Sequence, residues 1–458
     1  MPEVTPAAIE PDDETRKEKA DLGALLDAAP VRRGHIVTTA VLLCVLLIDG
    51  FDLAVTGQIL PAIAATLGVT TASLTGAFAM QPIGQALGGV LLSPLVDAYG
   101  RKRTLMVLLA LLSAVTLLSV FVSSVAEFAA TRFVAGMLGG GLLPAVASLV
   151  ADISPIKRRS AMVGIVYSGL GVGTVLASVL VAVSLDHVGW QGMYVMGALA
   201  PLLIIAPVLF LIPESPLHLA RKSASPAHIL GALRKLGIML PPGTRFREPP
   251  VRTGSRISII EVFRDRRAGF TLVLWLTCIC GQISVHLFTL GAIFFHEFGA
   301  VPLTSYAAYA SVGGLAAIVA SLSTGFVLDR FGRYRVIAVY ALIGTLSLVG
   351  MGVFPFGSAG FVAAIICAGF FAVGTYQSLN ILTPIVYPAA LRSAAVGWKG
   401  GASRLGSSAA PLIAAALLSQ QLGLQVAMSV AAVPLLLVAA LAPALAVLER
   451  RMLSPSDA

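Results

Sequence analysis

Two aspartates that could carry protons lie in a largely apolar stretch near the start of the chain. Asp49 and Asp52 fall within residues 36–60, a stretch long enough to cross a lipid bilayer. A carboxylate at that depth costs at least about 2.5 kcal/mol, so a sequence that keeps two of them there is expected to use them. We expect these two aspartates to couple the protein to protons or other ions.

The spacing of the two aspartates places them on one side of a helix. At a rise of about 1.5 Å and a turn of about 100° per residue, they stand ~4.5 Å apart along the axis and within ~60° of each other around it. Two buried carboxyl groups this close titrate as a coupled pair, which suits capture of a proton near neutral pH. The alternative is a structural ion pair with Arg132, and both interpretations hold together if one aspartate is paired and the other titrates.

Three basic residues also fall inside apolar stretches: Arg132, Lys399 and Arg404. Arginine suits a carboxylate ligand because its planar fork donates two parallel hydrogen bonds. We therefore expect Arg132 and Arg404 to contribute to an anion site, Arg404 as anion holder or as a tie between helices. Lys399 lies on a different helical face and is expected to extend toward the nearer membrane surface.

Two glycines, Gly136 and Gly140, follow Arg132 at intervals of four residues. Small residues with this spacing let two membrane helices approach closely, so we expect these glycines to serve packing and not to bind a ligand.

Uncharged polar side chains and one histidine complete the set of expected intramembrane groups. They are Gln81, Gln85, Gln282, His286, Gln377 and Asn380. The last four are our candidates for binding the polar groups of a substrate, and His286 is the best of them because histidine titrates near neutrality. The alternative for each of them is a hydrogen bond that joins two helices. For His286, a buried histidine whose hydrogen bonds are satisfied within the protein is an equally good interpretation.

The elements that must position these residues are membrane-spanning helices. The 458-residue chain is 57% hydrophobic and 12% charged, with a mean hydropathy of +0.92, whereas a soluble chain carries about a quarter charged residues. Apolar runs of about 20 residues recur along the chain and predict an all-α integral membrane protein of twelve spans. The spans are expected at residues 36–61, 71–96, 103–122, 127–151, 160–184, 190–212, 268–295, 303–328, 335–355, 358–386, 393–418 and 425–448.

The Lys and Arg residues outside these spans all fall on one side of the predicted bundle. Short cytoplasmic loops retain basic residues, so both termini are expected in the cytoplasm. The net charge of +9 then follows from topology and from attraction to anionic lipids, and requires no nucleic-acid partner. The first 30 residues contain no apolar core followed by a cleavage site, so no signal peptide is expected.

The four cysteines, Cys44, Cys278, Cys280 and Cys367, all fall within predicted spans. Cysteine there behaves as a small apolar residue. The spacing of Cys278 and Cys280 is a weak signal for a metal, so packing is the expected role and no metal site is predicted.

An internal repeat divides the spans into two sets of six. Asp97-Ala98-Tyr99-Gly100-Arg101-Lys102-Arg103 recurs as Asp329-Arg330-Phe331-Gly332-Arg333-Tyr334-Arg335, and Arg159-Ser160-Ala161-Met162-Val163-Gly164 recurs at nearly the same spacing as Arg392-Ser393-Ala394-Ala395-Val396-Gly397. Two parallel six-helix halves describe the major facilitator architecture, in which substrate binds between the halves and their rocking alternates its access.

The repeat also fixes the expected domain organisation. A proline-rich, basic stretch between the halves is expected to be a cytoplasmic linker and not a further apolar layer. The expected parts are a cytoplasmic N-terminal tail (1–34), a first six-helix bundle (35–212), the linker (213–267), a second six-helix bundle (268–449) and a cytoplasmic C-terminal tail (450–458).

The repeated turns are candidates for gates on the cytoplasmic face. An acid at the end of one helix and bases at the start of the next can form ion pairs across the halves in one conformation only. The alternative is plain positive-inside topology, which requires the basic residues but not the repeated Asp and Gly. The gating candidates are Asp97, Gly100 and Arg101 in the first copy and Asp329, Arg330, Gly332 and Arg333 in the second.

The two turns resemble the signature of the major facilitator superfamily, and further stretches resemble the aromatic acid:proton symporters. These stretches are Leu25-Leu26-Asp27-Ala28-Ala29-Pro30 with Asp49-Gly50-Phe51-Asp52, then Pro213-Glu214-Ser215, then Tyr387-Pro388, Arg392, Val396-Gly397-Trp398 and Arg404-Leu405-Gly406 leading to Pro411. The resemblance implies import of benzoate-like carboxylates with protons. It also implies that Asp49 and Asp52 are required for transport and that Asp97, Asp329, Arg132 and Arg404 match the family's loop aspartates and intramembrane arginines.

We therefore expect a proton-coupled importer of small aromatic carboxylates in a bacterial inner membrane, acting as a monomer with no cofactor besides the coupling proton. Alternatives are a facilitator for another organic acid, a sugar or a cyclitol, and a drug:proton antiporter. Asp49 and Arg404 argue against a sugar. An enzyme or receptor is not supported, because the sequence shows no nucleophile motif, metal-ligand cluster or appended soluble domain.

Overall fold

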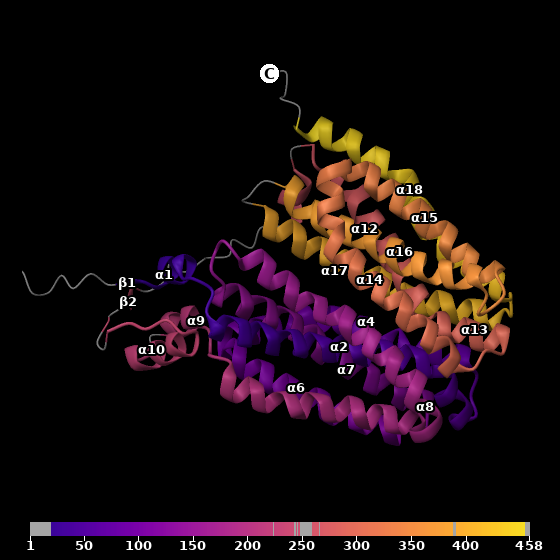
Figure 1. Cartoon of the computed structure of the whole chain (residues 1–458), viewed down its shortest axis with the longest axis horizontal. Helices are drawn as coiled ribbons and strands as arrows, with labels where there is room; N and C mark the ends of the chain where they lie inside the picture. Colours follow the sequence, from indigo (N-terminus) through magenta and orange to yellow (C-terminus); the bar gives the residue numbers. More distant parts are fainter. Residues whose placement is uncertain are drawn as a thin grey trace, which may run out of the picture.

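Long helices make up nearly all of the protein (Figure 1). The computed structural model describes residues 20–222, 224–241, 244, 246–247, 259–264, 266–387 and 391–453, so the expected tails and linker lie partly outside it. Besides helices and the turns that join them, this part of the chain contains a parallel pair of two-residue strands, β1 (Ala20–Asp21) and β2 (Phe246–Arg247).

Nine of the described helices are long and apolar enough to cross a membrane. Each coincides with one or two of the predicted spans. They are α2 (Arg33–Leu67), α6 (Arg101–Leu118), α7 (Val125–Ile153), α8 (Arg159–Leu211), α12 (Ala268–Thr289), α14 (Leu303–Phe331), α15 (Arg333–Val353), α16 (Ala359–Val386) and α18 (Leu424–Leu453).

Three features reconcile these helices with twelve predicted passes. α8 contains a break at Gly189, where φ is 65°, so it consists of two successive passes. The second pass is divided into α3 (Thr71–Phe78), α4 (Met80–Leu91) and α5 (Ser93–Tyr99), each too short to span alone. α17 (Arg392–Ser419) is long enough, but its basic residues and glycines lower its hydropathy.

The passes form two halves, α2 to α8 and α12 to α18, which approach at one end and diverge at the other (Figure 1). We call the end where the halves approach the closed end. α13 (Gly291–Gly299) lies there, and Thr71 of the first half donates a 2.6 Å hydrogen bond to Oε1 of Glu297 in α13. The turns after α5 and α14 lie at the end where the halves diverge, which we call the basic end.

The apolar core has the same asymmetry between the two ends. One buried cluster at the closed end contains side chains of both halves, among them Ile63 and Phe78 from the first and Phe294 and Phe361 from the second. At the basic end each half has a cluster of its own. The halves are therefore packed together at the closed end and separate at the basic end.

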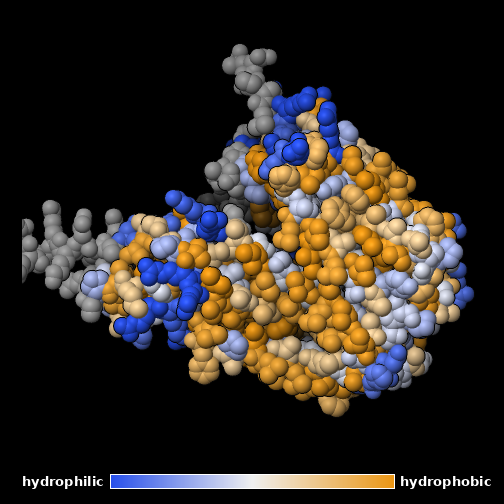
Figure 2. All heavy atoms as spheres, viewed as in Figure 1, coloured by the Kyte–Doolittle hydropathy of each residue, from blue (hydrophilic) through white to orange (hydrophobic). Residues whose placement is uncertain are grey.

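Apolar side chains cover most of the outer surface in view, as expected for helices that face lipid (Figure 2). Leu203 and Phe326, for example, are 74% and 69% exposed. In water these residues would form an unfavourable surface, and in a bilayer they contact acyl chains.

Parts of the expected N-terminal tail and of the expected linker fold onto the first half, which was not predicted from the sequence. α1 (Leu22–Ala28) and α10 (Pro226–Lys235) bury Leu22, Leu26, Ile229 and Leu233 in the cluster of that half. α9 (Pro216–Arg221) lies beside them, and α11 (Ile259–Phe263) precedes α12. The prolines of the linker are compatible with these helices, because Pro216 and Pro226 start α9 and α10, where proline is well tolerated.

The repeated turns depend on glycine. Gly100 and Gly332 have φ values of 100° and 88°, a region that other residues rarely adopt, and each separates two helices. This explains why glycine recurs at the same place in both copies of the motif.

Close packing holds each half together. A Cβ atom added at Gly136 of α7 would lie 2.0 Å from the carbonyl oxygen of Gln81 in α4, and one added at Gly140 would lie 2.2 Å from that of Gln85. The predicted packing role of these glycines is confirmed. The second half contains the same kind of close helix contact at glycine, because a Cβ atom at Gly369 would lie 2.0 Å from the carbonyl oxygen of Gly313.

We predict that Gly136→Ala forces α4 and α7 apart and destabilises the protein by about 1–3 kcal/mol. Gly164→Ala is the matched control, because the added methyl group meets no atom within 4 Å, and alanine in a helix is favoured over glycine by about 1 kcal/mol. Thermal unfolding of the purified proteins in detergent should show a lower midpoint for Gly136→Ala only. Equal midpoints for the two variants would contradict the packing argument.

Candidate functional site

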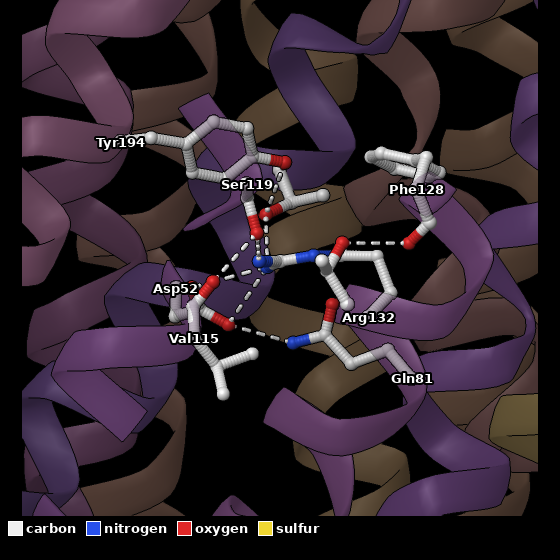
Figure 3. A network of polar contacts seen from close by, with 9 residues as sticks. Asp52, Gln81, Val115, Ser119, Phe128, Arg132 and Tyr194 are labelled. Atoms are coloured by element: carbon white, nitrogen blue, oxygen red, sulfur yellow. Dashed lines mark hydrogen bonds and ion pairs between the residues drawn. The ribbon is translucent and has the colours of Figure 1, made fainter. Parts of the chain in front are cut away.

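A closed ion-pair network in the first half holds Asp52 (Figure 3). Nη1 of Arg132 lies 3.3 Å from Oδ1 of Asp52, and Gln81 donates a 2.8 Å hydrogen bond to Oδ2. Nη2 of Arg132 donates to Ser119 at 2.5 Å, and its guanidinium lies 4.9 Å from the ring centroid of Tyr194. Because Arg132 is 0% exposed and Asp52 only 6%, this network is buried.

The ion pair between Asp52 and Arg132 that the sequence predicted is therefore present. Thr56 joins it, because it accepts 3.3 Å hydrogen bonds from Arg132 and from the hydroxyl of Tyr194. Ser119, Thr56 and Tyr194 were not predicted from the sequence, because single hydroxyl groups in an apolar span give no pattern of their own. The geometry favours a fixed ion pair here, and binding of substrate by Arg132 stays a prediction.

Asp49 has a different environment from Asp52. Its carboxylate faces α7, where a Cβ atom added at Gly139 would lie 2.6 Å from its Oδ1. The side chain of Gln85 and the charges of Asp52 and Arg404 are its polar neighbours. Both aspartates face α4 and α7, so they lie on one side of α2, as their spacing predicted. Among the described residues, only Asp52 of the two has an arginine at ion-pair distance.

Arg404 reaches from the second half to the first. Its Nη1 donates to the backbone carbonyl of Gln85 in α4, and both Nη atoms lie within 3.6 Å of the position of a Cβ atom at Gly89. The half-buried guanidinium also interacts with the charge of Asp49 and with the phenols of Tyr167 and Tyr376, one from each half. Arg404 thus lies between the halves, next to Asp49.

A chain of polar side chains in the second half links three helices. Gln377 donates to Ser321 at 3.4 Å, Asn380 donates to Gln377 at 3.1 Å, and the amine of Lys399 donates to Asn380. Lys399 is only 4% exposed and its amine lies 5.5 Å from the ring centroid of Tyr376. The expectation that Lys399 extends to the membrane surface is therefore wrong, because Asn380 gives the amine a partner inside the bundle.

Gln282 and His286 lie one turn apart on α12. His286 bonds to the backbone oxygen of Gln282 through Nδ1 at 3.1 Å, whereas the side-chain oxygen of Gln282 is buried without a hydrogen-bond partner among the described residues. Gln282 packs against α17, where a Cβ atom added at Gly406 would lie 3.1 Å from its Cβ. Gln282 thus has a buried acceptor that no described residue satisfies, and the roles of all four polar candidates stay predictions.

At the basic end, the first copy of the repeated turn is bound by acids that the sequence analysis did not assign to it. Nε of Arg101 lies 3.3 Å from Oδ2 of Asp152, which also accepts a 2.6 Å hydrogen bond from Ser215. Oε1 of Glu214 accepts from the backbone N–H groups of Arg101 and Lys102 at 3.0 and 3.2 Å, a favourable place for a carboxylate at a helix N-terminus.

The second copy has a simpler set of contacts. Glu449, at the end of the last pass, lies 3.5 Å from Arg333 and accepts a 2.6 Å hydrogen bond from Tyr334. Asp329, Arg330 and Gly332 are exposed. The signal that could have found these acids is that Glu214 and Glu449 each follow the final pass of their half at nearly the spacing of the repeat.

The ion pairs described at the basic end each lie within one half: Arg101–Asp152, Arg333–Glu449 and Arg159–Asp27. The side chains of Asp97 and Arg392, and all of Pro388, lie outside what the structure describes. Pairing across the halves, which the gate hypothesis requires in one conformation, stays a prediction for a state in which the basic end is closed.

Comparison with known proteins agrees with this geometry. Residues 42–411 match the family model described as Major Facilitator Superfamily. This chain belongs to the major facilitator superfamily. It is therefore a multi-pass membrane transport protein and not an enzyme, and its twelve-helix fold in two halves is the fold of that family.

The similar proteins cover nearly the whole chain. A gallate transporter of Pseudomonas putida is 30% identical over 93% of this chain and 94% of its own length, and a 4-hydroxybenzoate transporter of Acinetobacter baylyi is 26% identical over 97% of both. Among solved structures, a bacterial homologue of the human lysosomal transporter Spinster, in an inward-facing and unoccupied conformation, matches with a TM-score of 0.70 at 15% identity, covering 93% of this chain and all of that one.

We predict that the transporter depends on Asp52 and Arg132 as a unit. Arg132→Met should destabilise it by about 3–5 kcal/mol, because the carboxylate of Asp52 is then buried without its partner. The double variant Asp52→Asn/Arg132→Met should lose less than the sum of the single variants. Thermal unfolding in detergent measures this coupling, with Asp49→Asn as the control at a carboxylate without an arginine at ion-pair distance. Additive losses would argue against the ion pair.

Proposed function

We propose that the protein imports small aromatic carboxylates together with protons by alternating access. The observation that carries the proposal is the position of Arg404, which reaches from the second half to the first beside the buried carboxylate of Asp49. A guanidinium is a good ligand for a carboxylate, and this one lies where both halves can respond to what it binds. The aromatic acids carried by the similar transporters support the substrate class.

Competition for Arg404 provides a means of coupling. When Asp49 is ionised, its charge attracts the guanidinium of Arg404. When a proton neutralises Asp49, Arg404 is released to bind the carboxylate of the substrate. Loss of the proton on the other side of the membrane restores the competition and expels the substrate.

The free side-chain oxygen of Gln282 supports a substrate that carries hydroxyl groups. A buried acceptor without a partner costs free energy that a donor on the substrate recovers. The phenol rings of Tyr167 and Tyr376, which lie near Arg404 on opposite halves, supply aromatic surface for a ring.

We also propose that the basic end faces the cytoplasm of a bacterial cell, in its inner membrane, and that the conformation described is inward-facing. The one-sided distribution of Lys and Arg supports this orientation, and the separate apolar clusters at the basic end support the conformation. An inside-negative potential opposes entry of an anion by ~2.3 kcal/mol per 100 mV, and one proton per carboxylate removes that cost.

Uptake measurements with the protein in proteoliposomes test this function. We predict that a radiolabelled hydroxybenzoate accumulates under an inwardly directed proton gradient, that a protonophore abolishes accumulation, and that sugars and dicarboxylates do not compete. Efflux-only transport of apolar cations would instead support a drug antiporter, and accumulation of another organic acid would change the substrate class.

Asp49→Asn should abolish proton-driven accumulation while exchange of labelled for unlabelled substrate continues, because a neutral side chain leaves Arg404 available but senses no proton. Asp186→Asn, the same change at an exposed position of α8, is the control. Asp52→Asn is also expected to abolish accumulation, through loss of the ion pair with Arg132. Accumulation at the wild-type level in Asp49→Asn would overturn the coupling mechanism.

Arg404→Ala should raise the apparent KM for the aromatic carboxylate about tenfold to a hundredfold, the value of a charged hydrogen-bonded contact. Arg404→Lys should recover part of the loss, because it keeps the charge without the planar fork. Arg335→Ala, at an exposed arginine of the basic end, controls for total charge. An unchanged KM in Arg404→Ala would show that the carboxylate binds elsewhere.

A further inference from the structure

A basic pocket lies at the basic end of the first half, away from Asp49 and Arg404. It has a volume of about 580 Å³ and lies where α5, α6, the end of α8 and α9 meet. Its polar lining consists of Lys102, Arg103, Lys222, Glu214 and His218 beside the ring of Tyr99. Neither the proposed transport mechanism nor the gating candidates use this cavity as a whole.

The charges of the pocket leave an excess of positive charge without a partner. The carboxylate of Glu214 accepts hydrogen bonds from backbone N–H groups at the start of α6. The amine of Lys102 donates a 2.6 Å hydrogen bond to the carbonyl of Leu209. Arg103 and Lys222 are exposed, and the described residues provide neither side chain with a hydrogen bond or an ion pair.

His218 is held toward its uncharged form. Burial and the neighbouring charge of Arg101 lower its pKa below the ordinary value, an effect only partly opposed by Glu214 and Asp152. The pocket therefore carries net positive charge, and Arg103 and Lys222 are its available donors.

The remaining walls of the pocket are apolar and continue onto the lipid-facing surface. Met106, Leu209 and Leu219 line it, and the next residues on the same helices, Val107 and Phe210, are 57% and 68% exposed. Figure 2 shows hydrophilic residues beside α9 and α10 directly next to this apolar surface. A ligand that fits both parts has an anionic head and an apolar chain.

We propose that this pocket binds the headgroup of an anionic phospholipid of the cytoplasmic leaflet, with an acyl chain along α6 and the end of α8. Basic pockets at the cytoplasmic ends of membrane helices have the chemistry that such headgroups require. The lipid phosphate would bind Arg103 and Lys222 and would lie next to Glu214, the acid that holds the start of α6.

The second half lacks this arrangement, although it carries the repeated turn. The position of Lys102 in the repeat is occupied by Tyr334, whose hydroxyl donates to Glu449. Arg335 corresponds to Arg103 and is exposed, so it offers the same charge without the pocket. This difference supplies a matched control within one chain.

The test is titration of phosphatidylglycerol into the full-length protein in an uncharged detergent, with bound lipid counted by native mass spectrometry. We expect saturable binding that weakens about tenfold to thirtyfold in Arg103→Gln/Lys222→Gln. Arg335→Gln/Arg450→Gln removes the same charge from exposed positions at the same end and should change binding less than twofold. The melting temperature of each variant verifies its fold, and Lys102 is kept because its amine contacts the backbone of α8.

Two further ligands distinguish the source of the anion. Phosphatidylcholine of the same chain length should bind more weakly than phosphatidylglycerol, and glycerol 3-phosphate, the headgroup without its chains, should bind more weakly than either. The proposal fails if the two double variants bind phosphatidylglycerol equally, if phosphatidylcholine binds as tightly, or if glycerol 3-phosphate matches the lipid. Because no substrate is involved, this result is independent of the proposed transport function.

Discussion

The buried guanidinium of Arg132 is the constraint on which the candidate site depends. A charge that is 0% exposed in an apolar bundle must have a counter-charge, and Asp52 supplies it. The same network ties α2 to α4, to α7 and to the end of α6 through Gln81 and Ser119. Asp52 is held inside its own half, whereas Asp49, one turn earlier, interacts with the charge of Arg404 from the other half.

This division separates the parts that stay fixed from the parts that change. Glycine contacts such as those of Gly136 and Gly140 fix α7 against α4, and the described ion pairs at the basic end each join helices of one half. Two polar contacts join the two halves instead. Arg404 donates to the backbone of α4, and Thr71 donates to Glu297. Each half can therefore move as a rigid body while such polar contacts, and the apolar cluster that both halves share at the closed end, are exchanged.

Much of the fold follows from patterns that span many residues, whereas the partners of single residues do not. The twelve passes, the two halves and the glycines of the repeated turns were predicted, because hydropathy and the repeat extend over the whole chain. The fold of α9 and α10 was missed, because two buried residues, Ile229 and Leu233, give little signal among prolines and bases. Lys399 was placed wrongly, because sequence spacing does not reveal that Asn380 of another helix meets its amine.

Under the proposed function, the cost of burying charge explains why proton and substrate move together. Closure of the halves around the site removes water from Asp49 and Arg404, and this is favourable only when their charges are balanced. An ionised Asp49 balances Arg404 when the site is empty, and a bound carboxylate balances it when Asp49 carries a proton. The other two states, with the proton alone or with the anion alone, leave one uncompensated charge at the interface. Closure is therefore permitted with both ligands or with neither, and a single salt-bridge competition between Asp49, Arg404 and the substrate is sufficient to produce symport.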